Sequence, residues 1–472
     1  MSWKDYIIIL QPELFIIAMI VVLLLIKIGS DGWRRDQFLW FINALLLLNF
    51  IGGVVLQPQG TLFHEMYKAN PLTNIEKSIL NAGVLLISLQ SYSWLRLHKH
   101  AEEFYMLMLS SLLGMFFMIS SNNLLQFYLG LELSTIPLAA ICNFDLDKRE
   151  SSESAMKLIL NSAFSSGLLL MGISLIYGAT GSLNFSEITP KLESSTLVLF
   201  AFVLLTSGFG FKISAVPFHL WTADVYQGAP VPVTSYLSVI SKGSLFFVFT
   251  SVLFTLFKPL SNDWYPVICL LAVLTMVIGN LFALRQKNIK RLLAFSSIAQ
   301  AGFILVGISA NSISGMSSVV YFILVYIFSN LGAFGVVSII SAYTGKEGIE
   351  DYRGLYKSNP LLAWILAISL FSLAGIPPTA GFFGKFFLLI AGAEKNNYTL
   401  IVIAALNMVV SLYYYLVLVK TIFLKGDESP LEKLPLPVLS RIALLLCVAG
   451  ILVLGLAGNV YDFIQNICSN IN

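Results

Sequence analysis

Residues 231–257 read VPVTSYLSVISKGSLFFVFTSVLFTLF, an apolar run with a single charged residue, Lys242, near its middle. The run exceeds the roughly 20 residues that a helix needs to cross a bilayer. An ionisable side chain at the centre of such a helix costs roughly 2.5–3.5 kcal/mol on insertion scales, and residues of this kind mark routes for ions or protons. The stretch therefore predicts a membrane-spanning helix that carries a functional charge.

Similar apolar runs recur from one end of the chain to the other. Of the 472 residues, 57% are hydrophobic and 11% are charged, whereas soluble domains carry about 25% charged residues. The chain is therefore predicted to be an all-α, polytopic membrane protein. Runs of about 20 apolar residues predict about fourteen spans, near residues 12–28, 37–56, 78–95, 104–120, 123–143, 155–178, 195–219, 231–257, 265–284, 289–309, 314–342, 361–394, 398–424 and 438–461.

Basic residues indicate the orientation of the chain in the bilayer. They gather after odd-numbered spans, as in Arg34 and Arg35, Lys148 and Arg149, and the cluster within residues 285–291. Because cytoplasmic loops are enriched in lysine and arginine, we expect these loops in the cytoplasm and both chain ends on the outer side. The basic residues form no stripe and the net charge is only +3, so the expected partner is the lipid bilayer rather than nucleic acid.

Helix-breaking residues interrupt two of the predicted spans. Proline lacks an amide hydrogen, so a broken span survives only where protein or water satisfies the freed backbone groups. The two breaks lie five spans apart, which predicts a five-helix unit that occurs twice, the second copy inverted. The breakers are Gly208, Gly210 and Pro217 in the seventh span and Gly375, Pro377, Pro378 and Gly381 in the twelfth.

The repeat divides one predicted transmembrane domain into four parts. Residues 1–100 hold three peripheral spans, 101–260 the first five-helix repeat, 261–430 the second, and 431–472 the last span. Interrupted segments in corresponding positions of two repeats are typical of a transport site.

Four ionisable residues inside spans form the candidate site. They are Glu132, Lys212, Lys242 and Lys385. Intramembrane charges are costly and usually functional, so we expect proton transfer, with Glu132 and Lys212 as a switchable pair, Lys242 at the centre and Lys385 in the second repeat. The alternative is structural: Glu132 and Lys242 would lock helices together, and Lys385 would extend its ammonium group to the membrane surface.

Three further residues are auxiliary candidates. Glu153 and Lys157 are four residues apart, a spacing that favours an intrahelical ion pair with either a relay or a purely structural role. His219 titrates near neutrality when unperturbed and would relay protons, or would simply hydrogen-bond at the membrane face.

No pattern predicts a cofactor or a metal in this chain. The cysteines are isolated from one another, the loop histidines lack metal-ligand spacing, and no nucleotide-binding fingerprint occurs. These residues are Cys142, Cys269, Cys447 and Cys468, with His64, His98 and His100.

Five longer strings closely resemble the antiporter-like subunits of bacterial respiratory complex I, the NADH:quinone oxidoreductase. The likeness is densest between about residues 122 and 390. The strings are YLGLELSTIPLAAI from residue 128, ESSESAMKLILNSAFSSGLLLMGISLIYGATGSLNF from residue 150, FKISAVPFHLWTADVYQGAPVPVT from residue 211, NIKRLLAFSSIAQAGF from residue 288 and SLAGIPPTAGFFGKF from residue 372.

The resemblance implies fourteen helices with two inverted repeats and a proton-pumping role in the membrane arm. It assigns proton transfer to Glu132, Lys212, Lys242 and Lys385, with Lys157 and His219 as auxiliaries. NADH, FMN, iron–sulfur clusters and quinone are then expected in other subunits, and homologous antiporter-like subunits as partners. The implied location is the bacterial inner membrane, with both termini on the periplasmic side.

One departure from the family pattern is visible at Gln300, where the string SSIAHAG would place histidine. Glutamine hydrogen-bonds but does not titrate, so a direct proton-carrying role is excluded there.

Two rival functions stay open. The same architecture suits a subunit of a multi-subunit cation/proton antiporter without redox activity, or a scaffold subunit whose charges only hold helices together.

Overall fold

The computed structural model describes residues 3–29, 34–424 and 431–470, most of them helical. The predicted boundary between the second repeat and the last span, at residues 430 and 431, borders residues 425–430, which lie outside the described residues. The helices are α1 (Trp3–Ile9), α2 (Gln11–Gly29), α3 (Arg35–Val55), α4 (Pro71–Gln90), α5 (Tyr92–Leu97), α6 (Ala101–Ile119), α7 (Leu124–Cys142), α8 (Arg149–Thr180), α9 (Phe185–Ile188), α10 (Thr196–Lys212), α11 (Leu220–Gly228), α12 (Val231–Tyr236), α13 (Lys242–Thr255), α14 (Ser261–Ala283), α15 (Ile289–Ser309), α16 (Ile313–Thr344), α17 (Leu355–Ser358), α18 (Pro360–Ala374), α19 (Ala380–Ala393), α20 (Tyr398–Phe423), α21 (Val438–Leu456) and α22 (Asn459–Ser469).

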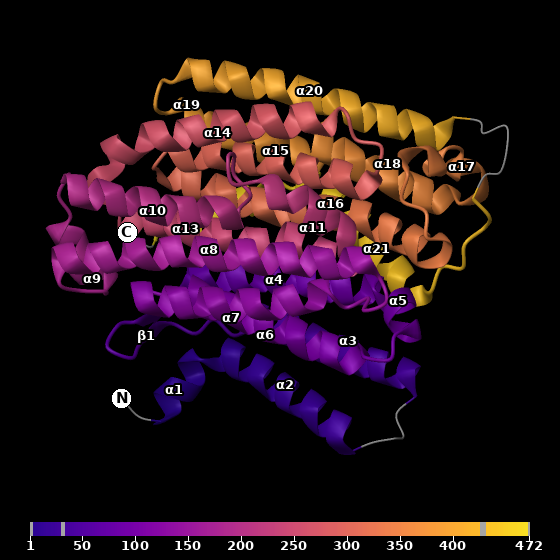
Figure 1. The fold of residues 1–472 in the computed structure, drawn as a ribbon, viewed down its shortest axis with the longest axis horizontal. Coiled ribbons are helices and arrows are strands. Elements are labelled where there is room, and N and C mark those ends of the chain that lie inside the picture. The colour runs from indigo at the N-terminus through magenta and orange to yellow at the C-terminus, as the bar shows by residue number, and fades with distance from the viewer. Residues whose placement is uncertain (1–2, 30–33, 425–430, 471–472) are drawn as a thin grey trace.

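The long helices lie side by side, with their axes roughly horizontal in Figure 1, and both chain ends lie at the same end of the bundle. Helix α16 is central: it packs against α4, α15, α18, α19 and α21. The remaining elements are short. They are an antiparallel hairpin of β1 (Gly60–Leu62) and β2 (Tyr67–Ala69), and the 3-10 turns η1 (Thr189–Lys191), η3 (Lys258–Leu260) and η4 (Ile349–Tyr352).

Eleven helical segments in the described residues are long and apolar enough to cross a membrane. They are α2, α3, α6, α7, α8, α12 with α13, η3 with α14, α15, α16, α20 and α21. This confirms a multi-pass membrane architecture that is mostly helical; the β1–β2 hairpin departs from the all-α prediction. Three shorter apolar helices, α10, α18 and α19, flank the predicted breaks.

The third predicted span was placed too late in the sequence. Residues 78–95 were expected, whereas α4 already begins at Pro71. The Asn70 side chain caps the helix by accepting the Thr73 amide at 2.8 Å, and proline suits the first helical position. The search for apolar runs missed the first two turns of α4 because Glu76 and Lys77 lie in them, yet both side chains are buried.

Both predicted interruptions are present. Helix α10 ends at Lys212 and α11 begins at Leu220, while α18 ends at Ala374 and α19 begins at Ala380. The freed backbone groups find partners within the protein, as expected: the Val216 amide donates to the Thr275 hydroxyl at 3.0 Å. Each break also contains a cis peptide bond before a proline.

Helices α6 and α7 cross at backbone contact, which requires glycine. A Cβ atom on Gly114 would lie 2.3 Å from the Ser134 amide nitrogen, and one on Gly130 would lie 2.8 Å from that of Met118. Backbone atoms cannot move aside as a flexible side chain can, so larger residues would force the two helices apart.

Gly114→Val should therefore destabilise the protein by about 1–3 kcal/mol or more, the usual cost of overpacking. The measurement is the midpoint of thermal unfolding in detergent. Gly178→Val is the matched control, because a Cβ atom there meets nothing within 4 Å. Equal midpoints for the two variants would contradict the close crossing.

Candidate functional site

Three lysines of the candidate site are buried next to helix irregularities. Their exposed fractions are 8% for Lys212, 4% for Lys242 and 1% for Lys385. Lys212 is the last residue of α10, and Lys385 lies in the second turn of α19, directly after the second break. Lys242 follows a π-helical turn, η2 (Leu237–Ser241), a local widening that often occurs at functional sites.

Lys212 is bound by hydroxyl groups rather than by a carboxylate. Its ammonium group donates to the Thr135 hydroxyl at 3.1 Å and to the Ser162 hydroxyl. The ion pairs among the described residues do not join Lys212 to Glu132, although the two charges interact electrostatically. One carboxylate oxygen of Glu132 is buried without a hydrogen-bond partner in the structure. The two predicted partners are thus close, but not in direct contact.

Lys242 likewise binds a hydroxyl group. Its ammonium group donates to the Ser297 hydroxyl of α15 at 2.8 Å and lies 5.3 Å from the centre of the Tyr226 ring. His219 is buried in the first break, and its two ring nitrogens have no hydrogen-bond partner in the structure. His219 interacts electrostatically with Lys242, so the break brings an auxiliary candidate near the central lysine.

A chain of hydrogen bonds approaches Lys385 from α15. The Ser296 and Tyr415 hydroxyl groups are 2.5 Å apart, and the Gln300 amide donates to the Tyr415 hydroxyl at 3.3 Å. Gln300 also donates to the Leu373 carbonyl at 3.0 Å, and Lys385 donates to the same carbonyl at 2.8 Å. That carbonyl lies in the last turn of α18, where helix carbonyls lack their usual partners. Gln300, the departure from the family pattern, therefore bridges α15 and the second break.

Helix α15 connects the central lysine to the second half of the chain. Ser297 contacts Lys242, whereas Ser296 and Gln300 belong to the chain that reaches Lys385. The helix is buried along its whole membrane-spanning window, so these polar side chains lie inside the bundle rather than on its lipid-facing surface.

The auxiliary pair is present and belongs to a larger network. Lys157 forms ion pairs of 2.7 Å with both Glu153 and Asp224, and Arg291 binds the other Asp224 oxygen at 2.8 Å. The intrahelical pair predicted from spacing is confirmed. Asp224 was missed, because its link to Lys157 arises only when α11 packs against α8.

Two further ion pairs were also missed: one is buried, and the other joins a buried lysine to a partly exposed glutamate. Lys77 contacts Glu13 at 2.6 Å, with 2% and 1% of the side chains exposed, and Lys290 contacts Glu347 at 3.1 Å. From the sequence, Lys290 is only one of the basic residues that indicate the orientation of the chain in the membrane. The partners are 64 and 57 residues apart in sequence, so no local spacing could have revealed either pair.

The described residues contain no group of three His, Cys, Asp or Glu side chains that could hold a metal ion. The four cysteines are free thiols.

A family model described as "NADH:quinone oxidoreductase/Mrp antiporter, TM" matches residues 121–411. The NADH-quinone oxidoreductase subunit N of Phocaeicola vulgatus is 45% identical over 97% of this chain and 98% of its own length. The subunit N of Azobacteroides pseudotrichonymphae is 44% identical over 97% of both chains.

Solved structures show the same architecture. A chain of respiratory complex I from Thermus thermophilus superposes with a TM-score of 0.82 at 29% identity, covering 96% of this chain and 98% of that one. A chain of the Mrp complex from a Dietzia species superposes with a TM-score of 0.87 over 100% and 98% of the chains, but at 19% identity this likeness shows the fold alone.

The Lys77–Glu13 pair provides a stability test. Lys77→Met leaves a buried carboxylate unpaired and should cost about 3–5 kcal/mol, whereas replacing both residues by apolar ones is often neutral. We therefore expect a lower unfolding midpoint in detergent for Lys77→Met and a recovered midpoint for the double variant Glu13→Leu/Lys77→Met. A double variant no more stable than the single one would show that the loss has another origin.

Proposed function

The chain belongs to the NADH-quinone oxidoreductase subunit N family, and on that premise we propose that it is a proton-translocating membrane-arm subunit of respiratory complex I. Electron transfer from NADH to quinone would take place in other subunits and drive proton movement through this one. The observation that carries the proposal is the identity of 45% over nearly the whole of both chains to a relative of that name.

The proposed path runs from Glu132 and Lys212 through Lys242 to Lys385. Two kinds of support come from the site: the three lysines are almost completely buried, and each donates to a neutral group rather than to a carboxylate. A hydroxyl group can accept a hydrogen bond from an ammonium group and donate one to a neutral amine. The contacts of Lys212 and Lys242 would therefore persist whether or not the lysine holds its proton.

We also propose fourteen membrane crossings in two inverted five-helix repeats, with peripheral spans within residues 1–100 and 431–472. The eleven membrane-length segments support this proposal, and α4 with the two interrupted segments would add the other three crossings. On the family membership we propose the bacterial inner membrane as the location, and by the positive-inside rule we propose that both termini are periplasmic. The proposed partners are the other membrane-arm subunits, including homologous antiporter-like ones, with NADH, FMN, iron–sulfur clusters and quinone held elsewhere in the complex.

The second candidate is a subunit of a cation/proton antiporter without redox activity, which the fold of the Mrp chain allows. Native-gel migration separates the two. Membranes solubilised in mild detergent should show this chain in a large assembly that reduces a quinone analogue with NADH. Migration in a smaller assembly without that activity would favour the antiporter.

Lys242→Ala tests the central step. We expect the complex to assemble and the initial rate of NADH-driven proton pumping in membrane vesicles to fall at least about tenfold, in line with the loss of a positioned proton-transfer group. Lys258→Ala, which removes an exposed lysine of η3, is the control and should pump normally. Normal pumping by Lys242→Ala would remove Lys242 from the path.

Glu132→Gln tests the predicted switch next to Lys212. The amide keeps the shape but cannot carry the negative charge, so the electrostatic interaction with Lys212 is lost. We expect a smaller proton gradient than in the unsubstituted complex when the same amount of NADH is added. The gradient is measured by quenching of a pH-sensitive dye. An unchanged gradient would argue against a role for this carboxylate.

A further inference from the structure

A pocket of about 350 Å³ lies where the first interrupted segment ends. Its walls come from five parts of the chain: Trp94 of α5, the α7–α8 loop with the start of α8, residues 227–232 where α11 meets α12, the start of α15, and the end of α16 with the residues after it. The loops that carry Lys148 and the 285–291 basic cluster are those predicted to face the cytoplasm. The pocket therefore opens on the predicted cytoplasmic side.

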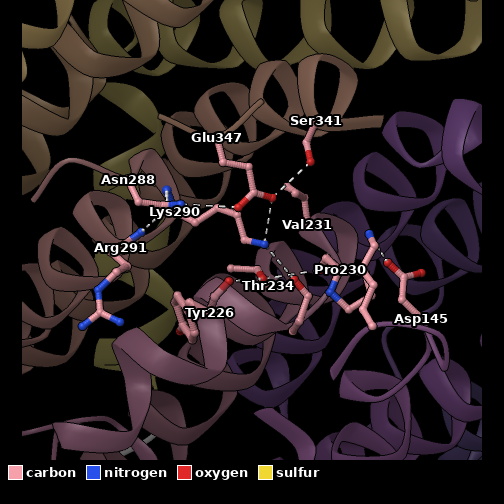
Figure 2. Close-up of polar contacts among 12 residues, drawn as sticks. Asp145, Tyr226, Pro230, Val231, Thr234, Asn288, Lys290, Arg291, Ser341 and Glu347 are labelled. Atoms are coloured by element: carbon pink, nitrogen blue, oxygen red, sulfur yellow. Dashed lines mark hydrogen bonds and ion pairs between the residues drawn. The ribbon is translucent and has the colours of Figure 1, made fainter. Parts of the chain in front are cut away.

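An ion pair forms the inner wall of this pocket. Lys290 is 4% exposed and donates both to the Ala229 carbonyl at 3.0 Å and to the Glu347 carboxylate at 3.1 Å. Glu347, whose side chain is 25% exposed, also accepts from the Ser341 hydroxyl at 3.1 Å. Figure 2 shows Lys290 between Glu347 on one side and the 226–234 segment on the other. Glu347 is thus reached from the pocket, whereas Lys290 is buried behind it.

Two stretches of chain connect the neighbourhood of this ion pair to that of Lys242. Along α15, Ser297 follows Lys290 by seven residues, which is two turns and about 10 Å on the same helix face, and Ser297 accepts a hydrogen bond from Lys242. Along the interrupted segment, Ala229 lies three residues after Tyr226, whose ring faces the Lys242 ammonium group. Tyr226 has a buried hydroxyl group without a hydrogen-bond partner in the structure.

The other inner carboxylate of the pocket, Asp145, has its charged partners outside α15, namely His98 and Lys148. Although burial opposes its charge, hydrogen bonds from His98 and Lys148 lower the pKa of Asp145 to about 2. Asp145 therefore remains an anion at neutral pH. Glu150, the third carboxylate, is exposed to solvent. Only Glu347 joins the pocket to a buried cation on α15.

We propose that this pocket is the proton-uptake vestibule for Lys242, with Glu347 as the collecting carboxylate and Lys290 as the residue that positions it. Glu347 takes a proton from cytoplasmic water and becomes neutral. Its bond to Lys290 then weakens, and the proton moves inward to Lys242 once Lys242 has passed its own proton on, which restores the carboxylate. This inference rests on the proposed function of Lys242.

Glu347→Gln in the complete complex is the first test. Gln can still bond to Ser341, but it cannot hold the transferred proton. We expect assembly and a fall of at least about tenfold in the initial rate of NADH-driven proton pumping in vesicles. The matched control is Glu150→Gln, which neutralises an exposed carboxylate of the same pocket and should pump normally. Normal pumping by Glu347→Gln would overturn the proposal.

A second measurement uses an assembled complex, in case Glu347→Gln does not assemble. Ser338 lines the pocket, so Ser338→Cys offers a thiol there for a positively charged methanethiosulfonate reagent. Labelling should slow pumping, whereas the same reagent should not slow pumping by the unsubstituted complex. Full pumping after stoichiometric labelling would overturn the vestibule.

Comparison with Lys242→Ala separates the two proposals. If Lys242→Ala stops pumping and the pocket variants do not, the vestibule alone is wrong; if Lys242→Ala pumps normally, the proposed path through Lys242 is wrong.

Discussion

A lysine buried in a membrane-spanning bundle must find its hydrogen-bond partners inside the protein, and this requirement shapes the centre of the molecule. The Leu373 carbonyl illustrates it, since it accepts from both Lys385 and Gln300. An unbroken helix would have used that carbonyl for its own next turn. The interruption from Gly375 to Thr379 leaves the Leu373 carbonyl without a helical partner. The break therefore provides the acceptor to which Lys385 donates.

The five buried lysines of the described residues fall into two classes by the partner they bind. Lys212, Lys242 and Lys385 donate to hydroxyl or carbonyl groups. Lys77 and Lys290 bind carboxylates. A carboxylate favours the charged lysine strongly, whereas a neutral partner does so less. The first class is therefore suited to exchange protons, and the second to hold structure or to position a carboxylate.

Polar groups that do not titrate complete the network. Gln300 stands where the family pattern would place histidine, and it links Tyr415 of α20 to the Leu373 carbonyl of α18. An amide can donate and accept at once, so it can order its neighbours without carrying a proton. Proton transfer toward Lys385 would then depend on the lysines and on hydroxyl groups, rather than on a titrating residue at position 300.

The sequence alone determined the membrane-spanning helical architecture, the two interruptions and the burial of Lys212, Lys242 and Lys385, because apolar run length, helix breakers and intramembrane charge are local properties. The Glu153–Lys157 pair was predictable for the same reason, since both residues lie on one helix. The early start of α4 was not predictable from the sequence, because its first two turns carry a glutamate and a lysine. The lysine, Lys77, is buried against Glu13 of α2, a partner that only packing brings near.

Tertiary structure decided which groups meet. Only packing places Asp224 against Lys157, separates Glu132 from direct contact with Lys212, and brings Glu347 to Lys290 at the inner wall of a pocket. These contacts join residues from different helices and loops, and no spacing along the chain encodes them. A local pattern can show that a charge is buried, whereas its partner is set by the way the helices pack.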